Sequence, residues 1–430
     1  MRGGRRLSMD DAVALVRPRD TLACGLAVGQ PQGFLEALGR RGDLEEVELY
    51  TGLLAQPYSF LQSQGVRVVS GFFGPVERAA RALGARVEYL AADFHGLERL
   101  ALGVAPRLVL AATTPPDAEG WLSLGLHAGA TFRPLQDAAR DPARVALAEV
   151  NPRMPRLLGL PELGGHRIHL SELDGWVEHE GELLALPEVD PTPEEVAIAR
   201  HVAEQIGEGA TLQFGIGGVP DTIARLLAAG APGGFGVHTE LMSDGVMHLH
   251  EAGKVTNRKG LYDGVSDATF ALGSERLYRW LDGNPAVRML PVSAVNDPAL
   301  LRRLGGFVSV NGALAVDLLG QVAADHVGGR QYSGVGGHES FVMGAREAPG
   351  GRSFVCLRAT AQVDGVRVST IVPRLPEGAS VTTPRHHAQF VVTEHGAVDV
   401  SILPDQARAR ALVELAHPDF RPGLAAALPR

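Results

Sequence analysis

Short apolar runs alternate with helical segments along most of the chain. These runs lie at 47–49, 66–69, 108–112, 145–150, 212–214, 307–310, 354–357, 368–372 and 390–392. Runs of this length are typical of buried strands when helical segments separate them. The pattern therefore predicts an α/β protein with parallel or mixed sheets that helices cover.

The clearest helix start is at Thr192. Thr192 can act as the N-cap, Pro193 suits the first helical position, and Glu195 completes a capping box. Apolar residues then recur at helical spacing as far as Ile206, and Gly207 ends the segment. The stretch before this helix, 184–189, has the composition of a connector. We therefore expect an N-terminal α/β domain over 1–188 and a C-terminal α/β domain over 189–430.

An internal similarity agrees with this division. Residues 20–25 lead through a turn to the apolar-periodic segment 34–38, and residues 210–215 lead in the same way to 223–227. Both stretches predict a strand, a turn with glycine and a helix. Two copies of a similar α/β unit are the simplest interpretation.

Composition excludes several classes of protein. The 430 residues are 45% hydrophobic and 21% charged, as in ordinary globular proteins. Cys24 and Cys356 are too few for a disulfide framework or a cysteine-based zinc site, which favours a reducing cytoplasm. A net charge of −9 disfavours nucleic acid as a partner. We see no signal peptide and no apolar run that could cross a bilayer, so we expect a cytoplasmic protein without a membrane partner.

Lysine is used in one place only. Of the 40 Lys and Arg residues, the two lysines are Lys254 and Lys259, within 253–260. Codon bias would explain the scarcity, but a site that needs a compact, rotatable ammonium would explain the survivors. Because this segment follows Glu240 closely, we favour a functional role for Lys259 and codon bias for Lys254.

Glu240 is the candidate for chemistry. It follows a short apolar run and precedes a predicted helix over 243–252, which places it at the carboxyl end of a strand. Active sites in α/β sheets favour that location. Strand alternation places His238 on the same face as Glu240.

Two glycine-rich segments could surround this carboxylate. One is Gly215-Ile216-Gly217-Gly218, before Pro220, and the other is Gly334-Val335-Gly336-Gly337. Glycine removes side-chain bulk and permits positive φ, so backbone N–H groups can point at an anion. Tight turns without a ligand would give the same pattern.

Three other chemistries fit less well. In a nucleotide-binding fingerprint Glu240 would be the acidic residue, but Pro220 stands where that fingerprint needs its third glycine. A metal site could use His248, His250 and Asp244, or the pair His386-His387, although no HExxH motif or cysteine ligand set is present. No Gly-x-Ser-x-Gly elbow supports a serine hydrolase.

The chain resembles the acetyl-CoA hydrolase/transferase family, which includes acetate, butyrate and 4-hydroxybutyrate CoA-transferases. The resemblance runs nearly end to end and is most specific in the second half. Its motifs are Glu149-Val150-Asn151, Met154-Pro155, Ser171-Glu172 with Asp174, Gly215-Ile216-Gly217 with Pro220-Asp221, His238-Thr239-Glu240 with Ser243-Asp244-Gly245, Val255-Thr256-Asn257 with Lys259, Val295-Asn296-Asp297-Pro298, Val310-Asn311, Asp317-Leu318 with Gly320-Gln321, Ser333-Gly334-Val335-Gly336-Gly337, Val391-Val392-Thr393-Glu394 with Gly396, and 416–421.

The resemblance implies a CoA-transferase (NagB/RpiA-like) fold of two similar open α/β domains with the active site between them. Glu240 would be the nucleophile, forming first an acyl-glutamyl anhydride and then a glutamyl-CoA thioester. Coenzyme A and its acyl esters would be substrates, with no permanently bound cofactor and no metal. The same resemblance implies a homodimer or higher homo-oligomer that acts on short-chain carboxylic acids.

The resemblance also assigns roles to other residues. Oxyanions would be stabilised by the N–H of Ile216 and by an N–H within 334–337, with Gly334 and Gly336 as catalytic candidates. The residues expected to contact substrate or CoA are Gly215, Gly217, Gly218, His238, Asn257, Lys259, Gly337 and His338. Of these, Lys259, with Arg258 beside it, would meet the phosphates of CoA.

Two segments depart from the family pattern. His338-Glu339-Ser340 replaces a stretch that usually begins with glutamine, and 398–403 replaces a stretch similar to Arg-Gly-Lys-Ser. These departures leave the acceptor open. An acyl-CoA hydrolase with the same machinery and a catalytically silent CoA-binding protein are the alternatives to a transferase.

Overall fold

The computed structural model describes residues 3–428 and divides the chain into two compact units. The first unit holds the chain up to Pro187 together with Asp267–Val295, and the second holds Glu188–Ser266 and the chain from Asn296 onward. The division expected from the sequence, 1–188 and 189–430, assumed two continuous domains. The structure differs from it because the excursion 267–295 groups with the first unit.

The first unit is built on a parallel sheet. Its strands lie in the order β1-β10-β8-β6-β2-β3-β4-β5, and every neighbouring pair is parallel. Their bounds are β1 Arg5–Arg6, β2 Arg19–Cys24, β3 Glu46–Thr51, β4 Val66–Ser70, β5 Val87–Tyr89, β6 Leu108–Thr113, β8 Val145–Val150 and β10 Gly175–Glu178. The chain order reverses between β2 and β6, as in doubly wound folds.

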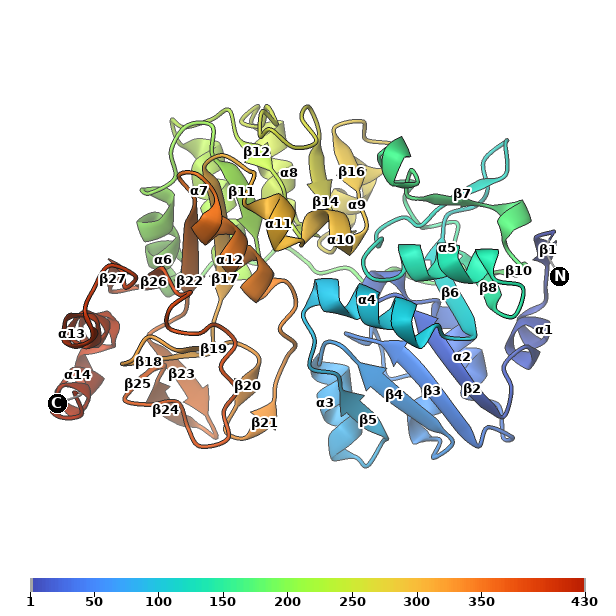
Figure 1. Cartoon of the computed structure of the whole chain (residues 1–430), viewed down its shortest axis with the longest axis horizontal. Helices are drawn as coiled ribbons and strands as arrows, with labels where there is room; N and C mark the ends of the chain where they lie inside the picture. Colours follow the sequence, from blue (N-terminus) through green and yellow to red (C-terminus); the bar gives the residue numbers. More distant parts are fainter. Residues whose placement is uncertain (1–2, 429–430) are drawn as a thin grey trace. The chain divides into compact units, whose positions relative to one another are not determined.

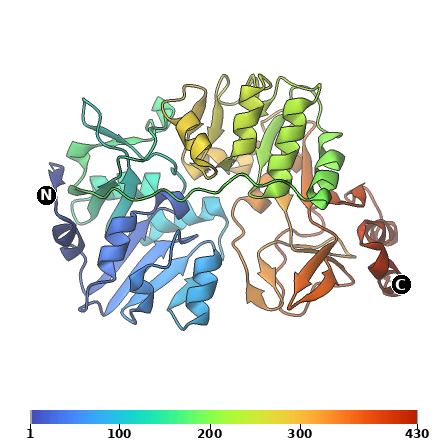
Figure 2. The same cartoon turned by 180° about the vertical axis from the view of Figure 1, so that it is seen from behind.

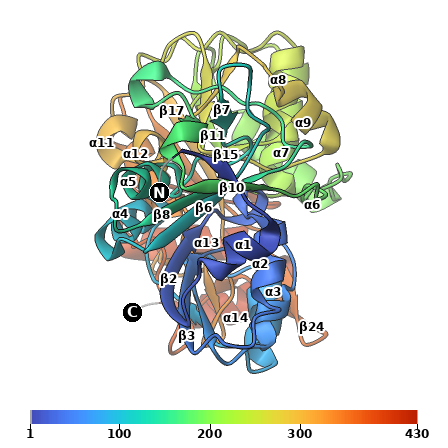
Figure 3. The same cartoon turned by 90° about the vertical axis from the view of Figure 1, so that its right-hand side faces the viewer.

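Helices cover both faces of this sheet. Figure 3 shows α1 (Met9–Ala14), α2 (Gln32–Leu38) and α3 (Pro75–Ala82) on one face, and α4 (Phe94–Val104) and α5 (Phe132–Arg140) on the other. A continuous apolar core lies under the first set, where Phe34 and Leu38 of α2 pack with Leu22 and Leu49 of the strands. This double cover explains why the central strand β6 is buried at every position.

The excursion 267–295 is held to the first unit by backbone contacts. The N–H groups of Ala128 and Gly129 donate to the carbonyl of Thr269 at 2.9 and 3.0 Å, and that of Ala271 donates to Leu126 at 2.8 Å. The excursion contains β15 (Phe270–Ala271), α9 (Glu275–Leu281), β16 (Val287–Met289) and α10 (Val292–Val295), and β14 (Ser266–Ala268) leads into it.

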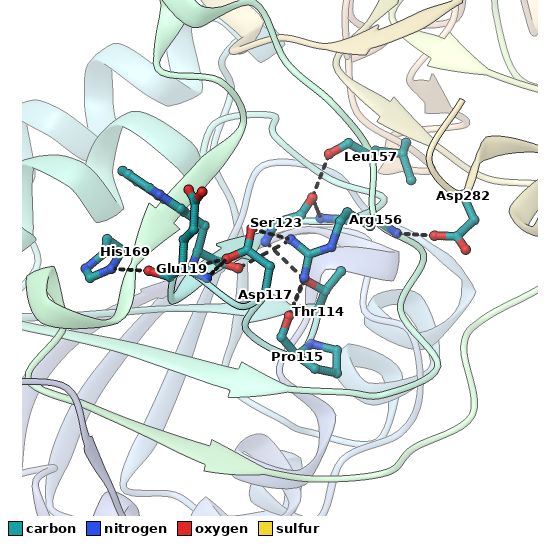
Figure 4. Close-up of polar contacts among 11 residues, drawn as sticks. Thr114, Pro115, Asp117, Glu119, Ser123, Arg156, Leu157, His169 and Asp282 are labelled. Atoms are coloured by element: carbon teal, nitrogen blue, oxygen red, sulfur yellow. Dashed lines mark hydrogen bonds and ion pairs between the residues drawn. The ribbon is translucent and has the colours of Figure 1, made fainter. Parts of the chain in front are cut away.

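A second attachment of the excursion is polar. Figure 4 shows Arg156 between Asp282 and the loop that follows β6: its N–H donates to Oδ1 of Asp282 at 2.7 Å, and its guanidinium donates to the carbonyls of Pro115 and Trp121. That loop ends at β7 (Trp121–Ser123), which pairs antiparallel with β9 (Arg167–His169). Arg156 therefore joins segments that are distant in the sequence.

The second unit contains a six-stranded sheet in the order β12-β11-β17-β22-β26-β27. The strands are β11 Thr211–Phe214, β12 Gly236–Val237, β17 Phe307–Gly312, β22 Arg352–Cys356, β26 Phe390–Thr393 and β27 Gly396–Asp399, with only β27 antiparallel. From β11 the chain goes to β12 on one side and then crosses to β17 on the other. The carboxyl ends of β11 and β17 therefore flank a topological switch point.

Helices also cover both faces of the second sheet. Helices α6 (Pro193–Ala203), α7 (Gly218–Ala229) and α8 (Asp244–Glu251) line the face seen in Figure 2, and α11 (Pro298–Leu301) and α12 (His338–Glu347) lie on the face seen in Figure 1. The capping box of α6 is confirmed: Thr192 Oγ1 accepts the N–H of Glu195 at 3.3 Å, and Glu195 Oε2 accepts the N–H of Thr192 at 2.9 Å.

The remainder of the second unit is a set of short strands and two helices. The strands are β18 Ala315–Asp317, β19 Val322–Ala323, β20 His326–Val327, β21 Arg330–Gln331, β23 Thr360–Val363, β24 Val366–Ser369 and β25 Ile371–Val372. The chain closes with α13 (Asp405–Leu415) and α14 (Arg421–Ala426). Within residues 3–428, none of the helices combines the length and the apolar character needed to span a bilayer.

Candidate active site

Glu240 lies three residues beyond the end of β12, at the carboxyl edge of the second sheet. The neighbouring β11 ends at Phe214 and leads into the Gly215–Gly218 turn. Two strands that end side by side therefore bring the carboxylate and the first glycine-rich segment to the same edge of the sheet, as the sequence predicts. The Glu240 side chain is half-buried and so remains accessible in part.

The Glu240 carboxylate is held by a side-chain amide. Nδ2 of Asn296 donates to Oε2 of Glu240 at 2.5 Å. Asn296 is fully buried, and its Oδ1 has no hydrogen-bond partner among the described residues. The motif 295–298 assigns Asn296 no role, because a contact across 56 positions leaves no periodic signal in the sequence.

The second glycine-rich segment reaches the same carboxylate. A Cβ atom at position 337 would overlap Oε2 of Glu240, the amide nitrogen of Asn296 and the ring of Phe341. Gly337 therefore leaves the space that the carboxylate occupies. Gly336 has φ +55°, a left-handed conformation that favours glycine.

Helix α12 begins directly after this contact. Gly337 is its N-cap, and the helix runs ten residues from His338 to Glu347. The N-terminal end of a helix carries partial positive charge and unpaired N–H groups, which favour an anion nearby. The nucleophile expected from the sequence is thus a carboxylate beside a positive helix end.

The Gly215–Gly218 turn is exposed. Ile216 is 49% exposed, and Gly217 has φ +131° where the chain enters α7. The N–H of Gly215 is already used, since it donates to the Val310 carbonyl at 2.9 Å. A Cβ at Gly218 would lie 2.6 Å from Oε1 of Glu195, so this glycine permits close packing of α7 on α6.

Helices α7 and α8 are locked together by the half-buried carboxylate of Asp221. Oδ1 of Asp221 accepts the hydroxyl of Ser243 at 2.8 Å and the N–H of Gly245 at 3.3 Å. Burial raises the pKa of Asp221, and these hydrogen bonds oppose the rise. Because α7 follows the exposed turn and α8 follows Glu240, this contact fixes the turn relative to the carboxylate.

His238 is enclosed by aromatic rings. It is fully buried, stacked on Tyr262 with ring centroids 6.4 Å apart and edge-on to Phe307 at 6.4 Å. The backbone N–H of His238 donates to the Leu212 carbonyl at 3.1 Å. The imidazole therefore packs beneath the site, next to the strand that carries Glu240.

Lys259 is buried as well, at 3% exposure. Its ammonium donates to the carbonyl of Tyr262 at 3.1 Å, and its own N–H donates to Asp263 at 2.8 Å. The lysine expected to meet CoA phosphates thus supports the loop 259–263 from inside. Its neighbour Arg258 is exposed.

Asn257 is a buried residue in a left-handed conformation, with φ +53° and 3% exposure. Its Oδ1 accepts the N–H of Val237 at 2.9 Å, and its Nδ2 donates to Ser266 at 3.1 Å. The side chain expected to contact substrate is therefore engaged with strand β12.

The loop that carries Gly334 and Gly336 is anchored by Asp325. The N–H groups of Tyr332 and Ser333 donate to the carbonyl of Asp325 at 2.9 and 3.0 Å, and Thr382 donates to its carboxylate at 2.5 Å. Asp325 itself is buried, at 4% exposure. A structured hairpin therefore positions this glycine-rich loop.

The segment that departs from the family pattern is packed inside the second unit. Burial lowers the pKa of His338 to about 4, so the imidazole is neutral at physiological pH. Glu339 accepts the hydroxyl of Thr383 at 2.6 Å and pairs with His387. The departure thus builds a tie between α12 and the segment 383–387.

The histidines considered as metal ligands are directed to separate partners. Nε2 of His248 meets Glu188 at 3.0 Å, whereas Nε2 of His250 meets Ser266 at 2.8 Å. Across residues 3–428, no group of three or more His, Cys, Asp or Glu side chains is arranged to hold a metal ion.

Comparison with known proteins places the chain in a family. A family model for the acetyl-CoA hydrolase/transferase C-terminal domain matches residues 273–428. Succinyl-CoA:cyclohexane-1-carboxylate CoA transferase of Geobacter metallireducens is 35% identical over 416 residues, covering 96% of this chain and 92% of that protein. The 4-hydroxybutyrate coenzyme A transferase of Clostridium kluyveri is 34% identical over 429 residues, covering 97% and 96%.

A solved structure shares the fold of this chain. RipA from Yersinia pestis superposes with a TM-score of 0.90 at 33% identity, over 98% of this chain and 96% of that chain. The fold and these similarities define a CoA-transferase. The chain belongs to the acetyl-CoA hydrolase/transferase family.

Proposed function

We propose that this enzyme moves CoA between a short-chain acyl-CoA and a carboxylic acid, with Glu240 as the covalent nucleophile. One observation carries the proposal: the Glu240 carboxylate, at the switch-point edge of the second sheet, accepts a hydrogen bond from Asn296 and lies against Gly337. A carboxylate is one of the side-chain groups that form covalent intermediates as nucleophiles, and partial exposure leaves this one accessible to a substrate. The relatives named above are transferases that act on succinyl-CoA and on 4-hydroxybutyrate.

The proposed reaction has two covalent stages. An oxygen of Glu240 attacks the thioester carbonyl, the C–S bond breaks, and CoA leaves as thiolate, so that an acyl-glutamyl anhydride remains. The thiolate then attacks the glutamyl carbonyl of the anhydride, which releases the first carboxylate and leaves a glutamyl-CoA thioester. The second carboxylate attacks this thioester, and the same steps in reverse deliver the new acyl-CoA and free Glu240. Thiolate suits the leaving role because thiols ionise near pKa 8.5.

Each stage passes through an oxyanion. We assign its stabilisation to the N–H of Ile216 and to an N–H at Gly334 or Gly336. The exposure of Ile216 and the adjacency of Gly337 to the carboxylate support this assignment. Removing one aligned donor typically costs about a hundredfold or more in rate.

Substrate contacts are proposed at the rims of the two glycine segments. Gly215, Gly217 and Gly218 would admit a substrate to the turn. Gly337 and His338 would approach it from the start of α12. For the phosphates of CoA, exposed Arg258 is better supported than buried Lys259. We also propose that the two units correspond to the two open α/β domains of the CoA-transferase (NagB/RpiA-like) type.

Trapping the intermediate tests this function. The enzyme is incubated with acetyl-CoA and reduced with borohydride, and the peptide that contains Glu240 is examined by mass spectrometry. We expect the mass of a reduced glutamyl side chain on that peptide, and none in Glu240→Gln. An adduct on another residue, or no adduct together with unaffected turnover in Glu240→Gln, would overturn the proposal.

The same assay separates transfer from hydrolysis. If the enzyme is a transferase, CoA is exchanged only when a short-chain acid is added. If water resolves the glutamyl-CoA thioester, acetyl-CoA is consumed and free CoA accumulates without an added acid. A silent CoA-binding protein would bind acetyl-CoA and show neither result.

A further inference from the structure

Strand β12, which leads to Glu240, is only two residues long and lies at the edge of its sheet. It pairs with β11 on one side, through Thr211 with Gly236 and Leu212 with Val237. An edge strand leaves its outer N–H and C=O groups unpaired unless other groups meet them. A strand this short has little pairing of its own to fix where the nucleophile lies.

The segment 254–257 closes this outer edge. The N–H of Phe235 donates to Lys254 at 2.8 Å, and the N–H groups of Thr256 and Asn257 donate back to the Phe235 carbonyl at 2.8 and 3.0 Å. The ladder would stop there, because the backbone turns away at Asn257 with φ +53°. The side chain of Asn257 continues it: its Oδ1 accepts the N–H of Val237, three residues before Glu240.

Asn257 is itself oriented from behind. Its Nδ2 donates to Oγ of Ser266 at 3.1 Å, and Ser266 Oγ meets Nε2 of His250 at 2.8 Å. Burial lowers the pKa of His250 to about 4, so this imidazole is neutral and can accept the serine hydroxyl. With Nδ2 committed to Ser266, the amide presents its oxygen to Val237.

These contacts coincide with the points where the chain changes units. Ser266 is the last residue of the second unit before the excursion 267–295, and Asn296 is the first residue after it. Ser266 contacts β12 through Asn257, which hydrogen-bonds both Ser266 and Val237. Asn296 donates directly to the Glu240 carboxylate. The two residues of the second unit that flank the excursion, Ser266 and Asn296, thus both contact the surroundings of Glu240.

We infer that Asn257, oriented by Ser266, is a positioning residue that fixes β12 and thereby places Glu240 for attack. This inference rests on the proposed function of Glu240 and replaces the expected contact of Asn257 with CoA. A displacement of about 1 Å at a nucleophile can cost on the order of a hundredfold in rate. The role is therefore visible in turnover, not in affinity for CoA.

The test compares three variants of the full chain. Asn257→Gly removes the side chain yet accepts φ +53° without strain, and Asn257→Asp keeps the oxygen that receives the Val237 N–H. Thr393→Val is the control. It deletes a buried hydrogen-bonding group elsewhere in the second unit, the Thr393 hydroxyl, which donates to the carbonyl of Leu415 at 2.7 Å. Each is assayed for kcat, for KM of acetyl-CoA and for the rate of the borohydride-trapped adduct.

We expect Asn257→Gly to lower kcat and the trapping rate about ten- to a hundredfold while KM stays within about twofold. Asn257→Asp should recover most of the rate, and Thr393→Val should lower the melting temperature with little change in kcat. A raised KM at unchanged kcat would instead make Asn257 a CoA ligand. An unchanged rate in Asn257→Gly would overturn the inference.

Hydrogen exchange gives a readout that does not depend on the chemistry. The Val237 amide should exchange faster in Asn257→Gly than in the natural protein, and Thr393→Val should leave it unchanged. Unchanged exchange at Val237 would remove the positioning role even if Glu240 is the nucleophile. If the Val237 amide exchanges faster in Asn257→Gly but the natural protein forms no adduct, Asn257 does position β12 and the proposed reaction is rejected.

Discussion

The amide of Asn296 and the carboxylate of Glu240 are joined by a hydrogen bond of 2.5 Å, from Nδ2 to Oε2. The donor is fully buried and the acceptor half-buried, so the bond forms at the boundary between core and solvent. A hydrogen bond to a charged acceptor is short and about twice as strong as one between neutral groups. The bond therefore holds one carboxylate oxygen of Glu240 in place.

Removing this donor should slow the chemistry. A hydrogen bond to a charged group is worth about 1.5–3 kcal/mol, so Asn296→Ala should lower kcat about ten- to a hundredfold. Asn296→Asp should lower it further, because a second carboxylate would repel Glu240 where the amide attracted it. Steady-state kinetics with acetyl-CoA and an acid acceptor measure both. Equal activity of the two variants would show that a negative charge at position 296 does not affect the reaction.

Adding one methyl group at Gly337 should displace the Glu240 carboxylate. The new Cβ of Gly337→Ala would overlap Oε2 of Glu240 and Nδ2 of Asn296, so one of these side chains must move. We expect turnover to fall by about a hundredfold, whereas the global fold survives because the overlap concerns side chains only. Kinetics and circular dichroism of the purified variant check the two parts.

Gly305→Ala serves as the control for that experiment. It lies in the same unit, has no atom within 4 Å of the added Cβ and does not need a positive φ. It should keep full turnover. If Gly337→Ala remained as active as Gly305→Ala, Gly337 would have no part in shaping the site.

Local sequence signals predicted local structure well. Thr192, Pro193 and Glu195 lie at the start of α6 as expected, and the apolar runs at 47–49, 108–112 and 212–214 lie in β3, β6 and β11. These features depend on neighbours within a few residues, which periodicity and capping record. The run 368–372 is an exception: it falls in β24 and β25, outside the two large sheets, because β-propensity does not specify a partner strand.

Contacts between distant positions could not be predicted in the same way. The bond between Asn296 and Glu240 spans 56 residues, and the excursion 267–295 joins the first unit through contacts with 126–129. The burial of Lys259 was also missed. The scarcity of lysine suggested a functional role, but it does not indicate whether the side chain faces solvent or the interior. Strand β12 is too short to show a periodic pattern in the sequence. Only the structure shows that Asn257, in the loop beside it, has φ +53° and is therefore constrained.

The first unit contains a buried carboxyl that should make its stability depend on pH. Glu149 on β8 accepts the N–H groups of Gly33 at 3.1 Å and Phe34 at 2.7 Å, at the start of α2. Burial raises its pKa from 4.5 to about 7, and the two N–H donors oppose the rise. Because the folded-state pKa exceeds the unfolded-state value, the folded state binds the proton more tightly.

The contribution of Glu149 to stability is therefore complete below pH 4.5 and is lost as the pH rises to about 7. Glu149→Gln does not titrate and mimics the protonated form. Relative to this variant, the natural protein should lose up to about 3 kcal/mol of unfolding free energy across that window and stay level above it. Urea unfolding at several pH values measures the difference, and a difference that grows toward low pH would contradict the sign.

Arg156 offers a test of how the loop that follows β6 is held in the first unit. Its guanidinium donates to the carbonyls of Pro115 and Trp121 and lies 3.7 Å from Asp117. Arg156→Ala would remove one donor from each carbonyl, whereas the N–H of Asp117 still donates to Trp121 and the hydroxyl of Thr114 to Pro115. Two hydrogen bonds are lost, and each typically contributes about 0.5–1.5 kcal/mol, so we expect a loss of about 1–3 kcal/mol in unfolding free energy. Arg153 is the matched control, since its pair with Glu180 at 3.2 Å is exposed on both sides, and an exposed pair contributes little. Thermal melting should therefore separate Arg156→Ala clearly from Arg153→Ala, and equal melting temperatures would mean that the loop after β6 does not depend on Arg156.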